Sequence, residues 1–357
     1  MTNFEKWNKE FRSQNLFAFN SNENALMWLK VRAVCRGKQI QQFLVNNDIT
    51  LTSSKIAEQN VELFEMLETM PNAMQLLDAF LNERNHEWYN TMGIDEENLK
   101  NDLYKVHHYA WGGDQNKHLV SRYVKVISNY DELQSKQNEI ADNAWNYVQT
   151  SWYNNWTSYL IESLFKRHKN VISAVGEIKS VDFFLNNNPI DLKVTFFPNQ
   201  YMEEKLKIKL GKRELTWLKQ KAREVGIAVD CTQTDSQQLY TLSEKLAEIG
   251  RNDILEELKN KRKEVITDAQ SNVLELMTWL YANQGEMRFG AENRLFLILV
   301  DSTNMNESWK MKRAFALIEP KVKDYLDHFN EDSLKEINFR FKGNQYKSLA
   351  DVIFVVK

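Results

Sequence analysis

The sequence predicts an α/β protein in which a helical amino-terminal region precedes a mixed β-sheet flanked by helices. Three observations predict it. Residues 1–150 follow helical spacing, short runs rich in Val, Ile and Phe begin after Lys169, and Leu295 to Val300 is an uninterrupted apolar run. Such a run is typical of a strand buried on both faces. We therefore expect two parts, 1–150 and 151–357, the second with a helical insertion at about 205–290.

Four segments of the amino-terminal part have apolar residues at helical spacing, and only 4 Pro and 11 Gly interrupt the whole chain. Pro71 ends the second segment, since proline cannot continue a helix interior. The fourth has neither Gly nor Pro and continues into the second part. The predicted helices are Asn24–Val45, Ser53–Met70, Asn72–Phe80 and Tyr130–Lys166.

The second part alternates between segments with the apolar spacing of strands and segments with that of helices. Three strands are predicted first, then the helices of the insertion, the buried strand, one more helical stretch and two closing strands. In chain order these segments are Val171–Ile178, Ser180–Leu185, Pro189–Phe197, Lys212–Val225, Ser236–Leu280, Leu295–Val300, Trp309–Phe329, Ile337–Phe341 and Val352–Val356.

Two of these strands are predicted to form a hairpin that carries charged side chains on one face. If residues 186–189 form the turn, Leu185 lies opposite Ile190 and Asp182 lies opposite Lys193. Because side chains alternate along a strand, Asp182, Asp191 and Lys193 then share a face, while the opposite face is wholly apolar. A slip of one residue would scatter the three charged groups.

Two carboxylates and a lysine on one face suit a metal-assisted reaction at a phosphate. Mg²⁺ prefers oxygen ligands, here Asp182, Asp191 and the Leu192 carbonyl. Such an ion stabilises charge on a phosphate and acidifies a bound water, and Lys193 would hold that water or neutralise charge. The alternative interpretation is a solvated hairpin face with a weak surface salt bridge.

With its surroundings, this segment resembles the PD-(D/E)XK nuclease superfamily, which has the restriction-endonuclease-like fold. The match lies in Asp182 and in Asp191-Leu192-Lys193, although Val181 stands where the family often has Pro. The family places a helix with an acid before the hairpin; residues 152–167 match it, with Glu162 as that acid. Glu177 is a second candidate ligand. The resemblance covers about residues 150–357 and implies Mg²⁺-dependent hydrolysis of DNA, most like that of a Type II restriction endonuclease.

The charge distribution gives no global indication of nucleic-acid binding, because the formal net charge is −3. Locally, 205–223 is strongly basic and opposed in sequence only by Glu214, so it is predicted either to track a DNA backbone or to be a solvated helix face. Polar residues before Leu295, among them Asn293 and Arg294, are candidates for phosphate or base contacts, or for an exposed loop. The candidate DNA-binding residues are Lys205, Lys207, Lys209, Lys212, Arg213 and Arg288.

Other functional classes are disfavoured. No apolar run is long enough to cross a bilayer, the amino terminus lacks the pattern of a signal peptide, and Cys35 and Cys231 have no CxxC partner. We therefore expect a cytoplasmic protein without a structural zinc site or a disulfide framework. His107-His108 is read as a polar loop or helix end rather than a metal site.

Double-strand cleavage needs two active sites, so the expected partners are double-stranded DNA and a second copy of the chain. The helical amino-terminal part would then serve target recognition, dimerisation or both. Two rival functions stay open, a structure-specific repair or recombination nuclease and a catalytically inactive DNA- or partner-binding protein on the same fold. We also expect Asp191→Ala to abolish cleavage and leave folding intact.

Overall fold

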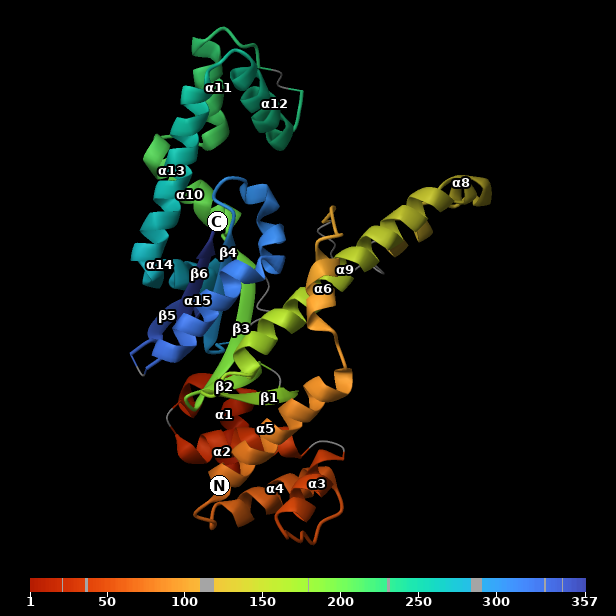
Figure 1. Ribbon diagram of the computed structural model, residues 1–357, viewed down its shortest axis with the longest axis vertical. Coiled ribbons are helices and arrows are strands. Elements are labelled where there is room, and N and C mark those ends of the chain that lie inside the picture. Colours follow the sequence, from red (N-terminus) through yellow and green to blue (C-terminus); the bar gives the residue numbers. More distant parts are fainter. Residues whose placement is uncertain are drawn as a thin grey trace.

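The computed structural model describes the chain except residues 21, 36–37, 110–118, 179, 230–231, 284–290, 331 and 342. The fold is mixed α/β, as predicted, with strands and helices interleaved after an all-helical start (Figure 1). In the described residues, no helix is both long and apolar enough to cross a membrane.

The described strands form one six-stranded mixed sheet in the order β1-β2-β3-β4-β6-β5. The first three strands are antiparallel, β3, β4 and β6 run parallel, and β5 pairs antiparallel with β6. All seven residues of β4 are buried, which confirms the strand predicted from its unbroken apolar run. The strands are β1 (Val171–Ile178), β2 (Val181–Leu185), β3 (Asn188–Phe196), β4 (Arg294–Val300), β5 (Lys335–Phe341) and β6 (Asn344–Val356).

Helices cover both faces of the central strands. Leu295, Leu297 and Leu299 of β4 pack with α9 (Gln137–Lys166), the 3-10 helix η3 (Met305–Arg313) and α15 (Phe315–His328). Phe296 and Ile298 face the other way, toward α10 (Asn199–Leu210), α13 (Asn252–Ser271) and α14 (Val273–Asn283). Alternate β4 side chains therefore enter two different cores.

The amino-terminal helices pack on strands β1 and β2 and share a core with Ala174, Val181 and Phe184. Lys30 is fully buried among them, where its Nζ lies 2.5 Å from Asp78 and 3.4 Å from Asn187 at the hairpin turn. The region is thereby tied to the strands that carry the acids. Its elements are α1 (Asn3–Arg12), η1 (Leu16–Phe19), α2 (Glu23–Val34), α3 (Gln39–Asn46), α4 (Ile56–Leu67) and α5 (Ala73–Met92).

Two helices predicted to begin in the amino-terminal part are each divided in the structure. The helix expected over Asn24–Val45 is instead α2 and α3, since α2 ends at Cys35. A glycine at position 37 disfavours a continuous helix there. The helix expected over Tyr130–Lys166 is α8 (Tyr130–Ser135) followed by the 30-residue α9, and the boundary expected at residue 150 falls within α9.

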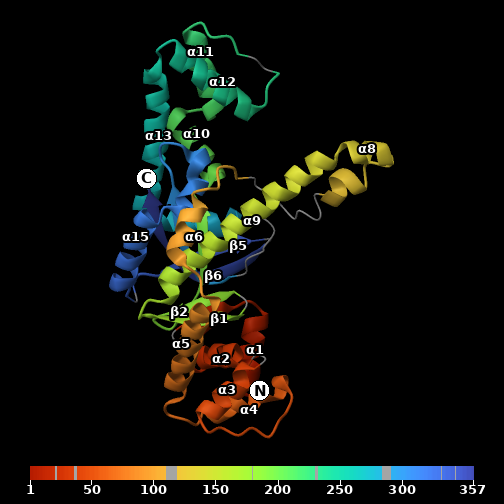
Figure 2. The same cartoon turned by 45° about the vertical axis from the view of Figure 1, so that its right-hand side comes forward.

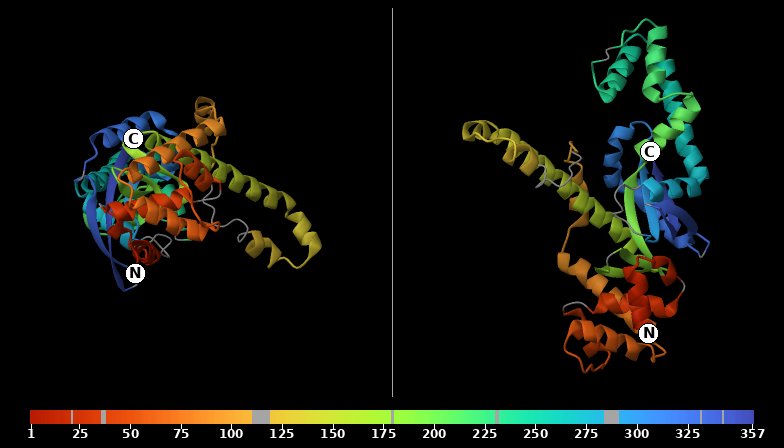
Figure 3. Two further views of the ribbon diagram at one scale, coloured as in Figure 1. Left: turned by 90° about the horizontal axis from the view of Figure 1, so that it is seen from below. Right: turned by 180° about the vertical axis from the view of Figure 1, so that it is seen from behind.

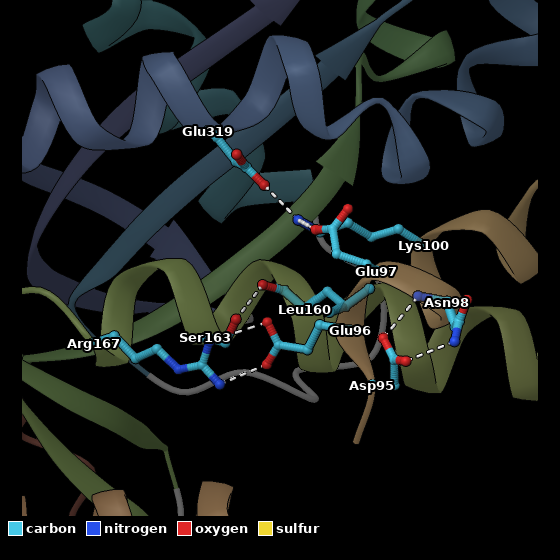
Figure 4. A network of polar contacts seen from close by, with 9 residues as sticks. All are labelled: Asp95, Glu96, Glu97, Asn98, Lys100, Leu160, Ser163, Arg167 and Glu319. Carbon is cyan, nitrogen blue, oxygen red and sulfur yellow. Dashed lines mark hydrogen bonds and ion pairs between the residues drawn. The ribbon is translucent and has the colours of Figure 1, made fainter. Parts of the chain in front are cut away.

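α9 projects away from the sheet with α8 at its far end (Figure 2). Near its base, α6 (Glu96–Leu103) joins it to α15. The Glu96 carboxylate accepts two hydrogen bonds from Arg167, at 2.5 and 3.0 Å, and Lys100 pairs with Glu319 at 3.0 Å (Figure 4). These contacts fix the base of the helix that carries Glu162.

The predicted helical insertion lies between β3 and β4 and consists of α10, α11 (Glu214–Glu224), α12 (Asp235–Glu248), α13 and α14. Its outer helices have a small core of their own around Trp217, Leu218 and Leu246. They extend from the sheet at the end opposite the amino-terminal helices (Figure 3, right).

Candidate active site

The register predicted for the hairpin is wrong by two residues. Phe183 pairs with Ile190 and Leu185 with Asn188, so the turn consists of Asn186 and Asn187 alone. Both have left-handed backbone angles, φ 44° and 63°, which Asn tolerates and a tight two-residue hairpin requires. Because the slip is even, Asp182, Asp191 and Lys193 stay on one face, but Asp182 no longer lies opposite Lys193.

The candidate site begins where β2 and β3 stop pairing. One step beyond the Phe183–Ile190 pair, the register places Asp182 opposite Asp191. At this point the Asp182 side chain, rather than the β2 backbone, bonds to β3: its Oδ2 accepts a hydrogen bond of 2.8 Å from the Leu192 amide nitrogen. Two acids from neighbouring strands thus lie side by side where the pairing of β2 with β3 ends.

Both carboxylates are partly buried, which disfavours their charged form. Burial and, after it, the Asp191 charge raise the pKa of Asp182 to about 6, although the Leu192 hydrogen bond acts to lower it. Burial also raises the pKa of Asp191, opposed mainly by Arg294. Two acids that repel each other in a partly buried site are stabilised by a cation.

Arg294 is a partner of Asp191 that the sequence did not identify. Its Nε donates to Asp191 Oδ2 at 3.2 Å, and its other end pairs with Glu292 at 3.0 Å. Arg294 is 0% exposed, and Asn293 is equally buried, with bonds to Asn20 and to the Pro189 carbonyl oxygen. Neither interpretation of these two residues, as phosphate or base contacts or as an exposed loop, fits their burial; Arg294 instead contacts Asp191 from β4.

Lys193 lies two residues beyond Asp191, partly buried, and its charge acts on the Asp191 carboxylate. A second lysine, Lys312 of η3, lies near it. Burial lowers the pKa of Lys312 to about 8, and the Lys193 charge contributes. Lys312 Nζ donates to Asn154 Oδ1 at 2.8 Å, and Tyr109 donates to the same oxygen at 3.1 Å. The structure thus brings two ammonium groups together at this end of β3.

The third predicted acid is close to the pair. Glu162 of α9 is a source of the raised pKa of Asp182, and it also pairs with Lys166 at 2.7 Å. Glu177 is in β1, but its side chain lies outside the described residues, as does the whole of Arg288. Among described side chains, no group of three or more His, Cys, Asp or Glu is placed to hold a metal ion.

The basic stretch has more acidic partners than its sequence neighbourhood shows. Lys205 pairs with Glu275, and Lys209 lies 2.7 Å from Asp268 and 3.4 Å from Glu264. These acids come from α13 and α14, which fold back on α10. Lys212 donates to Gln220 at 2.5 Å, and Lys207 and Arg213 are exposed. In the folded chain these lysines therefore have acidic partners besides Glu214, which favours the solvated-face interpretation.

The loop after α6 fits the polar-loop interpretation of the histidine pair. His107 and His108 are both exposed, directly after the buried Val106. The neighbouring Trp111, Gly112 and Gly113 lie outside the described residues.

Comparisons of the chain with protein-family models, with characterised proteins and with solved structures give no match.

We expect Asp182→Asn to stabilise the protein near neutral pH. The folded-state pKa, about 6, lies above the ordinary value of 3.8, so the charged carboxylate costs stability as pH rises from about 4 to 6. An amide oxygen can still accept the Leu192 hydrogen bond. The gain in free energy of unfolding should be about 1–3 kcal/mol at pH 7.5 and vanish at pH 4. Urea unfolding at both pH values measures it; an equal gain at both would refute the electrostatic explanation.

Proposed function

We propose that this protein is a Mg²⁺-dependent nuclease that hydrolyses phosphodiester bonds of DNA. The observation that carries the proposal is the pair Asp182 and Asp191, side by side where two strands separate, with Lys193 on the same face. Partly buried acids in mutual repulsion are a costly arrangement for a fold, which indicates a functional reason to keep them.

The donor set fits Mg²⁺, because it consists of oxygen atoms and carries concentrated negative charge. Asp182 and Asp191 would hold the ion with the Leu192 carbonyl oxygen, and Glu162 or Glu177 would assist. When bound, the ion supplies positive charge to a phosphate oxygen and acidifies a water. Lys193 would position the attacking water or the phosphate, and Lys312 would add positive charge beside it. Arg294 would orient Asp191 from within the core.

The more specific proposal is a Type II restriction endonuclease that cuts double-stranded DNA as a homodimer. It is supported by the family resemblance and by the helical regions flanking the sheet. Plasmid digestion distinguishes it from its rival. Discrete bands support sequence-specific cleavage, whereas preferential cutting of branched substrates would favour a repair or recombination nuclease.

One observation favours a second candidate, a DNA-binding protein of this fold without catalysis. Arg294 occupies one oxygen of Asp191 and so competes with a metal ion for it. In that case, the chain would bind DNA equally well with and without Mg²⁺ and would never cleave it.

The deciding experiment is nicking of supercoiled plasmid in Mg²⁺ and in EDTA, with wild type and Asp182→Asn. We expect cleavage only for wild type in Mg²⁺. Glu336→Gln is the matched control and should cut normally, since Glu336 lies on the edge strand β5, away from β2 and β3, and pairs there with Lys347 of β6. Cleavage by Asp182→Asn at the wild-type rate, or none by wild type in any divalent metal, would refute the proposal.

A further inference from the structure

The outer half of α9 carries an exposed apolar stripe. Trp145 is 63% exposed, Val148 55% and Trp152 36%, and Ala141 is also exposed. At about 100° per residue these four side chains fall within a narrow sector of the helix. Large apolar residues so aligned on a projecting helix are unusual for a solvated surface.

In the part of the chain that the structure describes, the contacts of the outer half of α9 lie mostly on the side away from the stripe. Toward the body, α9 buries Thr150, Tyr153 and Thr157, which lie on the opposite side of the helix. Farther out, the same opposite side is occupied, since Glu139 accepts hydrogen bonds from Arg122 and Tyr123. Figures 1 and 2 show the outer part of α9 projecting from the body, and among the described residues these contacts lie on the side of the helix away from the stripe.

The spacing of the stripe is that of a helix-pairing seam. Ala141, Trp145, Val148 and Trp152 are separated by 4, 3 and 4 residues, the alternation by which two helices mesh. In an antiparallel pair related by a two-fold axis, Trp145 faces Val148 of the second copy and Trp152 faces its Ala141. Each large side chain then meets a smaller one, so the stripe is complementary to itself.

We propose that this stripe binds the same stripe of a second copy, and that α9 thereby forms an antiparallel homodimer contact. Charge permits the pairing, since apart from Asp142 the residues flanking the stripe are uncharged. They are Gln137, Asn138, Gln149, Ser151 and Asn155. A nucleic-acid surface would instead be expected to carry cations beside the aromatic rings. The proposal stands independently of DNA cleavage.

The contact is small. Taking roughly 250 Å² for a whole Trp side chain, Trp145 and Trp152 together offer about 250 Å² per copy. A standard interface buries about 800 Å² per partner. The dimer should therefore be weak and dissociate on dilution.

Sedimentation of the full chain from about 0.5 to 100 µM tests the proposal. We expect a monomer–dimer equilibrium in wild type and at least a tenfold weaker dimer in Val148→Glu. Tyr130→Glu is the matched control, because Tyr130 is 74% exposed on α8, at the far end of α9, but lies outside the stripe. A monomer at every concentration, or equal weakening by both substitutions, would overturn the proposal.

Cross-linking tests the direction of pairing. A mixture of Trp145→Cys and Val148→Cys chains should form a disulfide-linked dimer under mild oxidation, because the two positions face each other in the antiparallel arrangement. Val148→Cys alone should link poorly. Efficient self-linking of Val148→Cys, with none in the mixture, would indicate a parallel pair and overturn the two-fold arrangement proposed.

Discussion

Arg294→Met is expected to lower the free energy of unfolding by about 3–5 kcal/mol, the range for breaking a buried ion pair by removing one partner. Arg294 is fully buried and holds Asp191 and Glu292 at opposite ends of its guanidinium group. Without it, two carboxylates lose their counter-charge in a partly buried setting. Urea unfolding at pH 7.5 measures the change.

The matched control for this prediction is Arg340→Met, on the exposed side of β5, which should change stability by less than about 0.5 kcal/mol. At lower pH the loss in Arg294→Met should shrink, since protonation removes the repulsion between the two acids. A loss below about 1 kcal/mol would mean that Arg294 is not the electrostatic centre of this region.

The sequence was enough to predict that the charged side chains of the candidate site share one face of the hairpin, but not the register in which the two strands pair. Side-chain alternation places Asp182, Asp191 and Lys193 together for any even shift of the hairpin, so an error of two residues left that grouping intact. The error arose in the turn, because three consecutive Asn residues, 186–188, each tolerate turn conformations. Only packing of the strands decides which two of them form it.

The partners of the site could not be predicted, because they come from distant parts of the chain. Arg294 reaches Asp191 through parallel pairing of β3 with β4, across the whole helical insertion. Lys312 approaches from η3, and acids of α13 and α14 reach the lysines of α10. Local periodicity contains no information on such pairings, whereas it was sufficient for the buried strand β4.

The structure also changes which variant separates catalysis from folding. Asp191→Ala, chosen from the sequence because Asp191 was expected to lie outside the core, would remove an acceptor from the buried Arg294. Its effect on cleavage would then be mixed with a loss of stability. Asp191→Asn keeps an oxygen for the Arg294 Nε and removes only the charge, so it is the cleaner substitution.

Asp191→Asn is accordingly expected to reduce Mg²⁺-dependent cleavage by about 1,000-fold or more, with stability within about 1 kcal/mol of wild type. The pKa of Asp182 should fall, since the Asp191 charge helps to raise it. Single-turnover cleavage and titration of Asp182 by NMR measure the two effects separately. Lost cleavage with an unchanged pKa of Asp182 would place the acids too far apart to share an ion. A lowered pKa with full cleavage would show that the pair exists but does not carry the chemistry.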